Sequence, residues 1–392
     1  MIKRTWHFLC ETLPPQNSSV GYYTLSLANG LAQLGHEVHI WYHSKKRERP
    51  RKKYKQLVNF HPIFTSWSKE EFSKMTMYID KSSKSSYIFL QYRPDFFGGC
   101  YNKNLNVFLQ QQTKKKHVLW TMFHIPYSEY VFNLKPRNIL SHFYEKQKAL
   151  QINKLSHKIF IPTGAWEKPL RSLAKEINKE KLHWLPLQST VPYIKDIRRA
   201  KNLRKAFAPD AQFLFGSFGS YYDLKHLDLL QQTIKCILTN HPERSFLLLG
   251  RGSDAFVERL KDENSNISSQ LETSGELDVK ALSAHVQSCD LMVQPYFQGV
   301  ATNRTSIMVS LAHGKPIVTN FGKNTEFVWG KSSCVVLSPD SDVKKMKTLC
   351  DKVIYDTAYR LNLGKKAIQV YDKFFSLNSI LDKILTLAKS KL

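Results

Sequence analysis

Cysteine is scarce in this 392-residue chain, and no two cysteines lie close together in the sequence. The six are Cys10, Cys100, Cys236, Cys289, Cys334 and Cys350. Their spacing excludes the CxxC pairs of a zinc site and the cysteine density of a disulfide scaffold. We therefore expect reduced thiols, most of them buried.

Long apolar runs are also missing. None approaches the roughly 20 residues that a helix needs to cross a bilayer. The stretch MIKRTWHFLCETLPPQ reaches Glu11 and two prolines too early for a secretory signal peptide. These absences favour a cytoplasmic protein. The chain exceeds the length at which a single core usually stops growing, so two domains are expected.

Acidic residues are few in the first half of the chain. Residues 1–205 contain 36 Lys and Arg against 13 Asp and Glu, whereas the remainder contains 22 against 19. Such an excess attracts phosphate-rich partners, namely nucleic acid, anionic lipid headgroups or an anionic polymer. The alternative is that compositional bias and solubility alone explain a lysine-rich surface.

Two basic runs carry much of this excess, and we predict that they contact an anionic membrane surface or an anionic acceptor. The residues concerned are Lys45, Lys46, Arg47, Arg49, Arg51, Lys52 and Lys53 in the first run, and Lys114, Lys115 and Lys116 in the second.

Strand and helix patterns alternate along the first half. RTWHFLC reads as a strand, the stretch from Gly21 to Leu34 has apolar residues at helical spacing, Gly35 ends that helix, and EVHIWY reads as the next strand. Further strands are predicted at SYIFLQY, KHVLWTMFH, HKIFIPT and KLHWLPL. A βαβ order implies a parallel, doubly wound sheet.

A second α/β series follows a polar, basic stretch between Pro192 and Pro209, which we interpret as a connector. Strands are predicted at QFLFGSFG, SFLLLG, DLMVQPY, PIVTN and SCVVLS, and 342–392 is predicted to be largely helical. The chain is thus predicted to form two Rossmann-like α/β domains, 1–195 and 205–374, that face a ligand-binding cleft.

The most informative segment is VATNRTSIMVSLAHGKPIVTN, residues 300–320. Its apolar positions form one helix face, which Gly314 ends. The preceding polar run lies between the carboxyl end of a strand and a helix N-terminus, where amides, hydroxyls and a guanidinium suit a phosphate or diphosphate. Its residues are Thr302, Asn303, Arg304, Thr305 and Ser306. A simple helix cap is the alternative.

Two glycines, Gly216 and Gly219, flank the first strand-to-helix turn of the second series, where backbone can approach a ligand closely. The turn matches neither GxGxxG nor a P-loop. Lys225 follows it and can act either as a phosphate counter-charge or as a solvated surface lysine. In the first series, His124 follows a strand and Gly21 lies in a polar loop. Each of them either contacts a ligand or has a structural role only.

Seven stretches follow one another in the order and spacing found in family-4-like glycosyltransferases of the GT-B fold, which the chain resembles over nearly its whole length. They are GYYTLSLANGLAQLGHEVHI, WTMFH, LPLQSTVP, FGSFGSYYDLKHLDLLQ, FLLLGRG, GELDVKALSAHVQSCDLMVQPY and GVATNRTSIMVSLAHGKPIVT.

The resemblance implies an acceptor-side first domain, a nucleotide-sugar site in the second domain, and a last helix, about 375–392, that returns to the first domain. It implies that His124 contacts the donor sugar, that Gly21 lies near the donor phosphates, and that Lys225 neutralises the diphosphate.

The chain departs from the usual family pattern at two glutamates. Ala301 and Val309 stand at those positions, and Ser217 stands where an arginine is common. The segment Gly299–Ser306 instead resembles a bacterial subgroup with a GVSTRRTS-like sequence. This match supports binding of the donor phosphates, while no residue is assigned to the ribose.

The resulting hypothesis is a retaining, metal-independent glycosyltransferase without a cofactor. It moves a sugar from a nucleotide sugar to a lipid-linked or anionic saccharide at the cytoplasmic membrane face. Fixed positive groups would stabilise the departing diphosphate. Two alternatives stay open: a glycosyltransferase-like partner subunit that has lost catalysis, and a nucleic-acid-binding protein, for which no reading motif is present.

Overall fold

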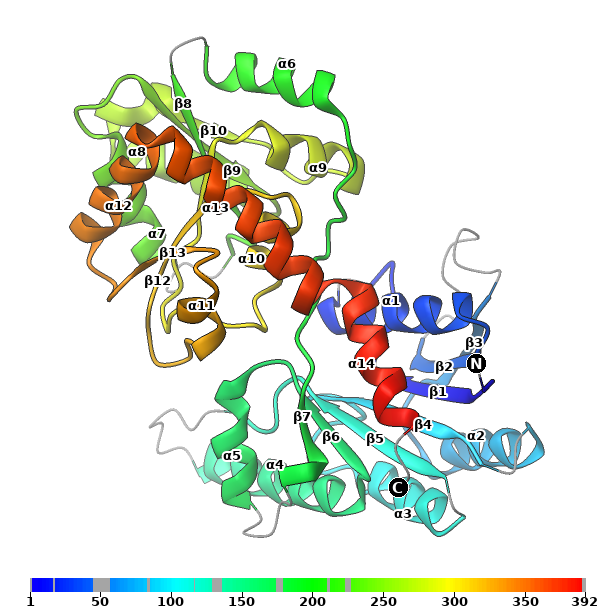
Figure 1. Ribbon diagram of the computed structural model, residues 1–392. Helices are drawn as coiled ribbons and strands as arrows, with labels where there is room; N and C mark the ends of the chain where they lie inside the picture. The colour runs from blue at the N-terminus through cyan, green and yellow to red at the C-terminus, as the bar shows by residue number, and fades with distance from the viewer. Residues whose placement is uncertain are drawn as a thin grey trace. The chain divides into compact units, whose positions relative to one another are not determined.

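The chain divides into two compact units. The first comprises Met1–Pro186 with Ile380–Leu392, and the second comprises Leu187–Ser379. The computed structural model describes residues 2–16, 18–44, 57–82, 85–115, 117–128, 136–173, 179–209, 212–222 and 227–389. Each unit is built on its own parallel sheet (Figure 1).

The first unit has a seven-stranded sheet in the order β3-β2-β1-β4-β5-β6-β7. All its strand pairs are parallel. The strands are β1 (Thr5–Cys10), β2 (Glu37–His43), β3 (Asn59–Phe64), β4 (Tyr87–Tyr92), β5 (Val118–Phe123), β6 (Lys158–Ile161) and β7 (Leu182–Trp184). The alternating pattern did not reveal β3, because Pro62 interrupts it; proline is tolerated there since β3 is an edge strand.

Helices cover both faces of this sheet, as the rule for parallel sheets requires (Figure 1). They are α1 (Ser19–Gln33), α2 (Lys69–Ser82), α3 (Asn104–Lys114), α4 (Pro136–Leu155), α5 (Glu167–Leu173) and the last helix α14 (Leu377–Lys389). None of the helices in the described ranges is long and apolar enough to cross a bilayer.

From Ile380 onward, the last helix α14 belongs to the first unit. The Ala388 carbonyl in its last turn accepts hydrogen bonds from Arg4 Nη2 at 3.2 Å and Tyr87 Oη at 3.1 Å. A Cβ on Gly30 of α1 would come within 2.5 Å of a Leu381 methyl group, so α1 and α14 are closely packed. These contacts satisfy a carbonyl that the helix itself leaves unpaired.

The second unit has a six-stranded parallel sheet in the order β10-β9-β8-β11-β12-β13. Its strands are β8 (Phe213–Phe218), β9 (Arg244–Leu249), β10 (Leu271–Thr273), β11 (Leu291–Val293), β12 (Ile317–Asn320) and β13 (Val336–Ser338). Its helices are α6 (Ile197–Phe207), α7 (Asp228–Leu238), α8 (Ser253–Glu263), α9 (Val279–Ser288), α10 (Thr305–Ala312), α11 (Phe327–Ser332), α12 (Val343–Tyr355) and α13 (Thr357–Val370).

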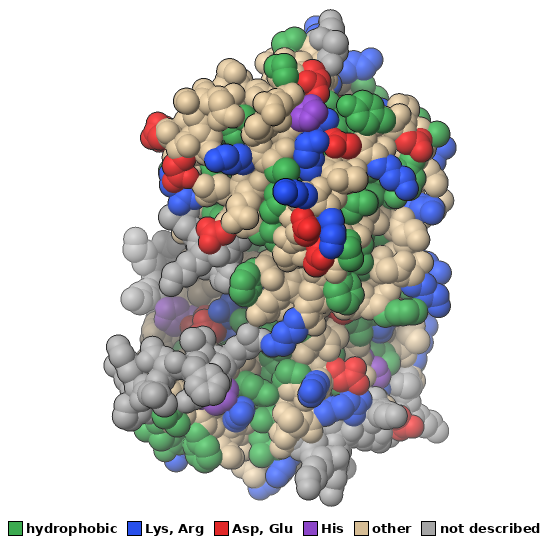
Figure 2. Space-filling model, turned by 90° about the vertical axis from the view of Figure 1, so that its left-hand side faces the viewer, with side chains coloured by type: hydrophobic (Ala, Val, Ile, Leu, Met, Phe, Trp, Pro, Cys, Tyr) green, Lys and Arg blue, Asp and Glu red, His purple; other side chains and the backbone are tan. Residues whose placement is uncertain are grey.

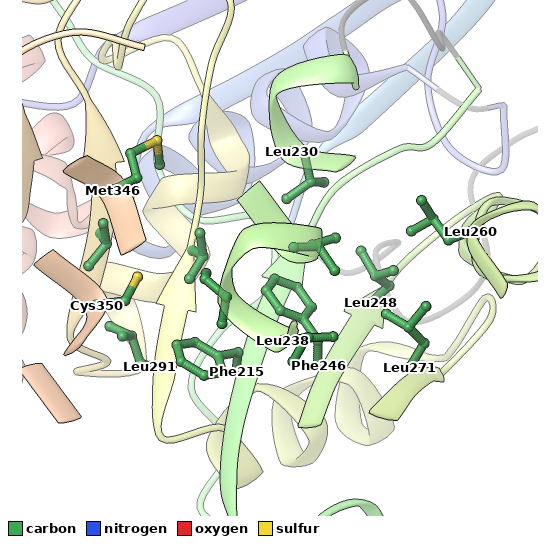
Figure 3. Close-up of a cluster of buried hydrophobic side chains, with 14 of the residues drawn as sticks. Phe215, Leu230, Leu238, Phe246, Leu248, Leu260, Leu271, Leu291, Met346 and Cys350 are labelled. Carbon is green, nitrogen blue, oxygen red and sulfur yellow. The ribbon is translucent and has the colours of Figure 1, made fainter. Parts of the chain in front are cut away.

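A continuous apolar core lies between this sheet and helices α7, α8 and α12 (Figure 3). Phe215 and Phe246 from adjacent strands stack at 5.9 Å, and Met346 and Cys350 of α12 close the layer above them. Burial of these side chains stabilises the packing of the helices on this face of the sheet. The positions of the strand ends are thereby fixed.

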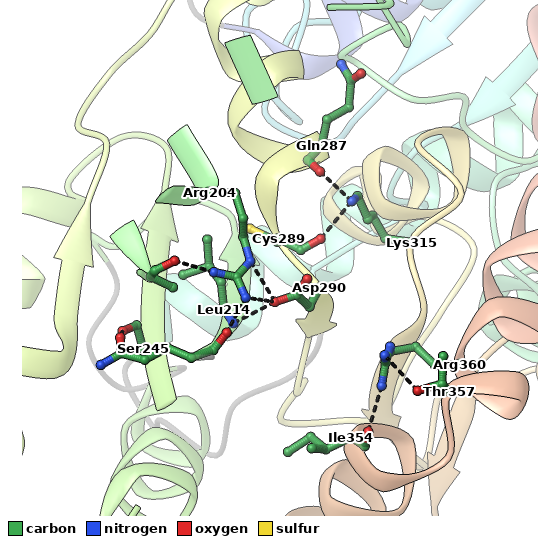
Figure 4. Close-up of polar contacts among 12 residues, drawn as sticks. Arg204, Leu214, Ser245, Gln287, Cys289, Asp290, Lys315, Ile354, Thr357 and Arg360 are labelled. Carbon is green, nitrogen blue, oxygen red and sulfur yellow. Dashed lines mark hydrogen bonds and ion pairs between the residues drawn. The ribbon is translucent and has the colours of Figure 1, made fainter. Parts of the chain in front are cut away.

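The prediction of a connector between Pro192 and Pro209 is wrong, because helix α6 of the second unit occupies most of this stretch. Asp196 caps the helix by accepting from Arg199 N at 3.2 Å. Arg204 forms an ion pair with Asp290 at 2.9 Å, and Asp290 also accepts from Leu214 N at 2.8 Å (Figure 4). One of the basic residues of α6, Arg204, therefore attaches the helix to the sheet through an ion pair and is not simply a solvated surface charge.

Three histidines, of which His7 and His39 are buried and His61 is half-buried, form a stack on β1, β2 and β3 of the first unit. His39 Nδ1 lies 3.0 Å from His61 Nε2, and the His7 and His39 rings stack at 4.8 Å. Trp41 Nε1 donates to His7 Nδ1 at 3.2 Å. Burial is the largest cause that lowers the pKa of both His7 and His39, so these rings are neutral near pH 7.

The histidine stack predicts that the protein loses stability in mild acid. In the unfolded chain these rings bind protons below about pH 6.5, whereas in the folded chain they resist protonation, so the free energy of unfolding falls as the pH is lowered through 6 and 5. Thermal unfolding between pH 5 and 8 measures this. We expect His7→Gln and His39→Gln to flatten the decline. Equal slopes in the wild type and both variants would contradict the assignment.

Candidate functional site

The candidate site lies at the carboxyl edge of the second sheet, where the strand order reverses between β8 and β11. Ligands of open α/β sheets bind at such a switch point. Gln294, just after β11, donates from Nε2 to the Phe218 carbonyl at 3.3 Å, which joins the ends of the two strands. The loop from β11 to α10 then runs over this edge and contains the predicted segment 302–306.

Helix α10 begins at Thr305, with Arg304 as its N-cap residue, and the Arg304 side chain forms no cap hydrogen bond. The first-turn amide of Ile307 is bonded by Tyr296, so the amides considered for a ligand are those of Thr305 and Ser306. Thr305 and Ser306 are the first two helical residues and are half-buried. A helix N-terminus of this kind favours an anion through its amides and its dipole.

Tyr296, at the start of the same loop, organises this helix start. Its hydroxyl lies 2.8 Å from Ser306 Oγ, and the Arg304 guanidinium sits 5.5 Å from its ring centroid. Burial raises the pKa of Tyr296 to about 12, so the hydroxyl is neutral. The exposed Arg304 side chain is thus held at the helix start by a cation–π contact and forms no ion pair within the described part of the chain.

Thr302 and Asn303 differ from the expectation for ligand-facing residues. Thr302 is fully buried, and its amide and hydroxyl donate to the Glu326 carboxylate. Asn303 Oδ1 is buried without a hydrogen-bond partner among the described residues. An amide oxygen only accepts hydrogen bonds and cannot donate one to a phosphate, whereas a guanidinium, a hydroxyl and a backbone amide can, so Arg304, Thr305 and Ser306 are the residues of the segment best suited to an anion.

The loop after β12 braces the loop after β11. Asn320 Oδ1 accepts from Tyr296 N at 2.8 Å, and Asn320 Nδ2 donates to Tyr296 O at 2.9 Å. Gly299 has a φ of +82°, and a Cβ there would lie 2.3 Å from Gly322 N. The two loops are therefore in backbone contact, which only glycine permits at this position.

The two predicted glycines of the first turn have different surroundings. Gly216 lies inside β8, and a Cβ there would come within 2.5 Å of Cys289 Sγ, so this glycine is required for packing of α9 on the sheet. Gly219 follows the strand, and a Cβ there would meet nothing within 4 Å. The space beside Gly219 is therefore open, and a ligand could approach its backbone closely. Lys225 lies outside the described residues.

In the first unit, Gly21 lies in the first turn of α1 rather than in a loop. Its amide donates to the capping Ser18 Oγ at 3.1 Å, and a Cβ would lie 2.4 Å from Thr12 O. Gly21 thus allows the loop after β1 to pack against the helix, a role that sequence reasoning did not foresee because α1 begins earlier than its apolar pattern.

His124 follows β5, as predicted, and is almost fully buried. Its Nε2 lies 2.9 Å from Gln91 Oε1, and the Tyr23 ring approaches edge-on at 5.7 Å. Burial lowers the pKa of His124 to about 3, with the Arg93 charge as a second cause. The imidazole is therefore neutral and donates from Nε2 to Gln91, which leaves Nδ1 as a hydrogen-bond acceptor.

The predicted basic surface can be described only in part. Residues 45–56 and Lys116 lie outside the described ranges. Lys115 forms an exposed ion pair with Asp80 at 2.6 Å, and Lys114 lies in the last turn of α3. Within the described ranges, no group of three or more His, Cys, Asp or Glu side chains could hold a metal ion.

Residues 212–356 match the model of a family described as glycosyl transferases group 1. This match confirms the expected enzyme class, a glycosyltransferase. No protein with a curated description matches the chain in sequence.

Solved structures resemble the whole chain. HepE of Anabaena, in complex with UDP and glucose, has a TM-score of 0.68 at 14% identity, covering 98% of this chain and 99% of that one. Sucrose-phosphate synthase from Thermosynechococcus elongatus has a TM-score of 0.72 at 13% identity, with 99% and 98% covered. WaaG, a glycosyltransferase involved in lipopolysaccharide biosynthesis, has a TM-score of 0.64 at 13% identity, with 98% and 100% covered.

The fold is GT-B. Two Rossmann-like units with parallel sheets, together with these similarities, confirm the predicted fold class. The narrower subgroup with a GVSTRRTS-like segment stays a prediction. Sequence reasoning missed two residues of the GT-B second unit that shape the candidate site, Tyr296 and Glu326. Tyr296 ends a predicted strand, whereas Glu326 lies in the polar stretch that follows the predicted strand PIVTN.

Contact between the two loops predicts that Gly299→Ala destabilises the protein. The added methyl group would meet backbone at a positive φ, so we expect a loss of about 1–3 kcal/mol in the free energy of unfolding. Gly330→Ala is the matched control, because that helical glycine has nothing within 4 Å of its Cβ position. The control should keep or slightly raise stability. Chemical denaturation measures both, and equal values would contradict the inferred contact.

Proposed function

We propose that the protein transfers a sugar from a nucleotide sugar to an acceptor, and that the N-terminus of α10 binds the diphosphate of the donor. The observation that carries the proposal is the pairing of the N-terminus of α10 with the exposed Arg304, whose guanidinium lies against the Tyr296 ring at the switch point of the second sheet. The family match covers this whole segment. HepE, the Anabaena structure of the same fold, binds UDP-glucose.

Charge explains why this arrangement suits the reaction. As the bond between the sugar and the diphosphate breaks, negative charge grows on the phosphate oxygens, and fixed donors stabilise that charge without reorganising. Arg304 supplies a full positive charge in bidentate geometry, and the amides of Thr305 and Ser306 add the helix dipole. Positive groups of the chain can therefore take the part that a metal ion plays elsewhere. Retention of configuration rests on the family resemblance alone.

The remaining predicted residues have auxiliary roles in this proposal. Gly219 gives the donor close access to the end of β8, and Lys225 adds a second positive charge. His124 offers a neutral acceptor nitrogen, which suits a sugar hydroxyl and does not suit proton transfer near pH 7. The second unit thus binds the donor, and the first unit supplies the acceptor side.

Nucleotide binding tests this proposal first. UDP, GDP, ADP and CMP are compared for a rise in melting temperature, and the most effective nucleotide defines the donor for a hydrolysis or transfer assay. We expect Arg304→Ala to lower turnover by about 10²- to 10³-fold, because one charge-stabilising donor is removed.

Arg198→Ala is the matched control, since Arg198 is an exposed arginine on α6 of the same unit. It should retain wild-type turnover. Wild-type turnover in Arg304→Ala would overturn the assignment of the site. A wild-type protein that no nucleotide stabilises would instead favour the alternative, a partner subunit that has lost catalysis.

We further propose that the protein works at the cytoplasmic face of a membrane, on a lipid-linked or anionic saccharide. The positive excess of residues 1–205 supports this. A second support is the exposed face of α4, where Ile139, Leu140 and Phe143 are 45%, 51% and 54% exposed and share one side of the helix. Figure 2 shows one face of the molecule, on which Lys and Arg side chains are spread among apolar ones.

Vesicle binding tests the membrane proposal. We expect wild-type protein to sediment with vesicles that contain anionic phosphatidylglycerol and not with phosphatidylcholine alone. The double substitution Leu140→Ser and Phe143→Ser should weaken binding about tenfold, because less apolar surface enters the interface. Leu361→Ser, at a residue of α13 that is 62% exposed, is the control. Equal binding by all three proteins would exclude α4 as a contact.

A further inference from the structure

Glu326 is the carboxylate to which the loop of the candidate site is attached. Thr302 N donates to both of its oxygens, at 3.2 Å and 3.1 Å, and Thr302 Oγ1 donates to Oε1 at 2.6 Å. Trp329 Nε1 donates to Oε2 at 3.0 Å. The carboxylate thus accepts from the loop after β11 and from helix α11, and it joins these two segments.

The position of this contact links it to the site. Thr302 lies two residues before Arg304, the N-cap of α10, and Glu326 is itself the N-cap residue of α11. Trp329 is 1% exposed and stacks on Phe375 at 5.9 Å, which anchors this end of the network in the core of the second unit. The contact therefore connects the start of α10 to helix α11, which Trp329 anchors among buried side chains of the second unit.

The contact is strong because the donors are buried. Thr302 is 0% exposed, so its amide and hydroxyl have no access to water and must be satisfied by the protein. Hydrogen bonds to a carboxylate are shorter and stronger than those between neutral groups. Alanine at position 326 would remove the acceptor to which the amide and hydroxyl of Thr302 donate.

The contact also decides which groups remain for a ligand. Glu326 engages the amide of Thr302, so an incoming anion meets the guanidinium of Arg304 and the first amides of α10 instead. The turn between Thr302 and Arg304 is closed by a bond from Arg304 N to Ala301 O at 3.0 Å. Movement at Thr302 would therefore be passed directly to the backbone that carries Arg304.

We propose that Glu326 is a positioning residue for the donor: by holding Thr302, it fixes the 301–304 turn so that Arg304 and the amides of α10 converge on one anion. This inference rests on the proposed function of the α10 site. It assigns to Glu326 no contact with the donor, because its carboxylate is engaged with Thr302 and Trp329 and would repel a phosphate.

The test separates positioning from general stability. Wild type, Glu326→Ala, Glu326→Gln and the control Glu258→Gln, at an exposed glutamate of α8, are compared for two quantities. These are the melting temperature without ligand, and the Kd by calorimetry for whichever of UDP, GDP, ADP or CMP stabilises the wild type most. We expect Glu326→Ala to raise the Kd about tenfold or more. Glu326→Gln should restore part of the affinity, since its amide oxygen still accepts from Thr302.

The outcomes are distinct. A lower melting temperature with a Kd within twofold of wild type in Glu326→Ala would mean that Glu326 is only structural, and would overturn the inference. If Glu326→Ala does not fold, Thr302→Val replaces it, because this variant removes only the hydroxyl bond; an unchanged Kd there would also overturn the inference. If the wild type binds none of the four nucleotides, the proposed function fails, and this inference fails with it.

Discussion

In a parallel sheet every strand runs in the same direction, so every loop that follows a strand leaves from the same edge. The candidate site depends on this constraint. Residues far apart in the sequence, such as Gly219, Tyr296 and Asn320, come to one edge because β8, β11 and β12 are neighbours in the sheet. The buried core beneath them keeps the strand ends in place.

Two neighbouring loops then set the direction of the functional groups at that edge. Asn320 binds both backbone groups of Tyr296, Gly299 and Gly322 are in contact, and Glu326 holds Thr302. A rigid frame of this kind matters for an electrostatic site, because charge stabilisation without reorganisation requires donors that are already oriented. Several donors compensate the charge of this half-buried carboxylate.

The sequence predicted much of the fold and less of the site. Most strands were predicted because apolar runs bounded by turns are a local property of the chain. The exceptions are informative: β3 contains Pro62, and α6 contains so many basic residues that it looked like a linker until its pairing with Asp290 was seen. In the second unit, a helix start next to the polar run 302–306 was predicted from the same local patterns, and so was the position of His124 after β5 in the first unit.

The sequence by itself determined the two α/β series, the polar run before α10, and the surplus of positive charge in the first half, since each depends on residue type and spacing alone. Only the tertiary structure decided which groups of that run face inward. Thr302 became a partner of Glu326, 24 residues away, and His124 became a neutral ring bonded to Gln91. These outcomes depend on burial and on contacts between different loops, and no local pattern carries that information.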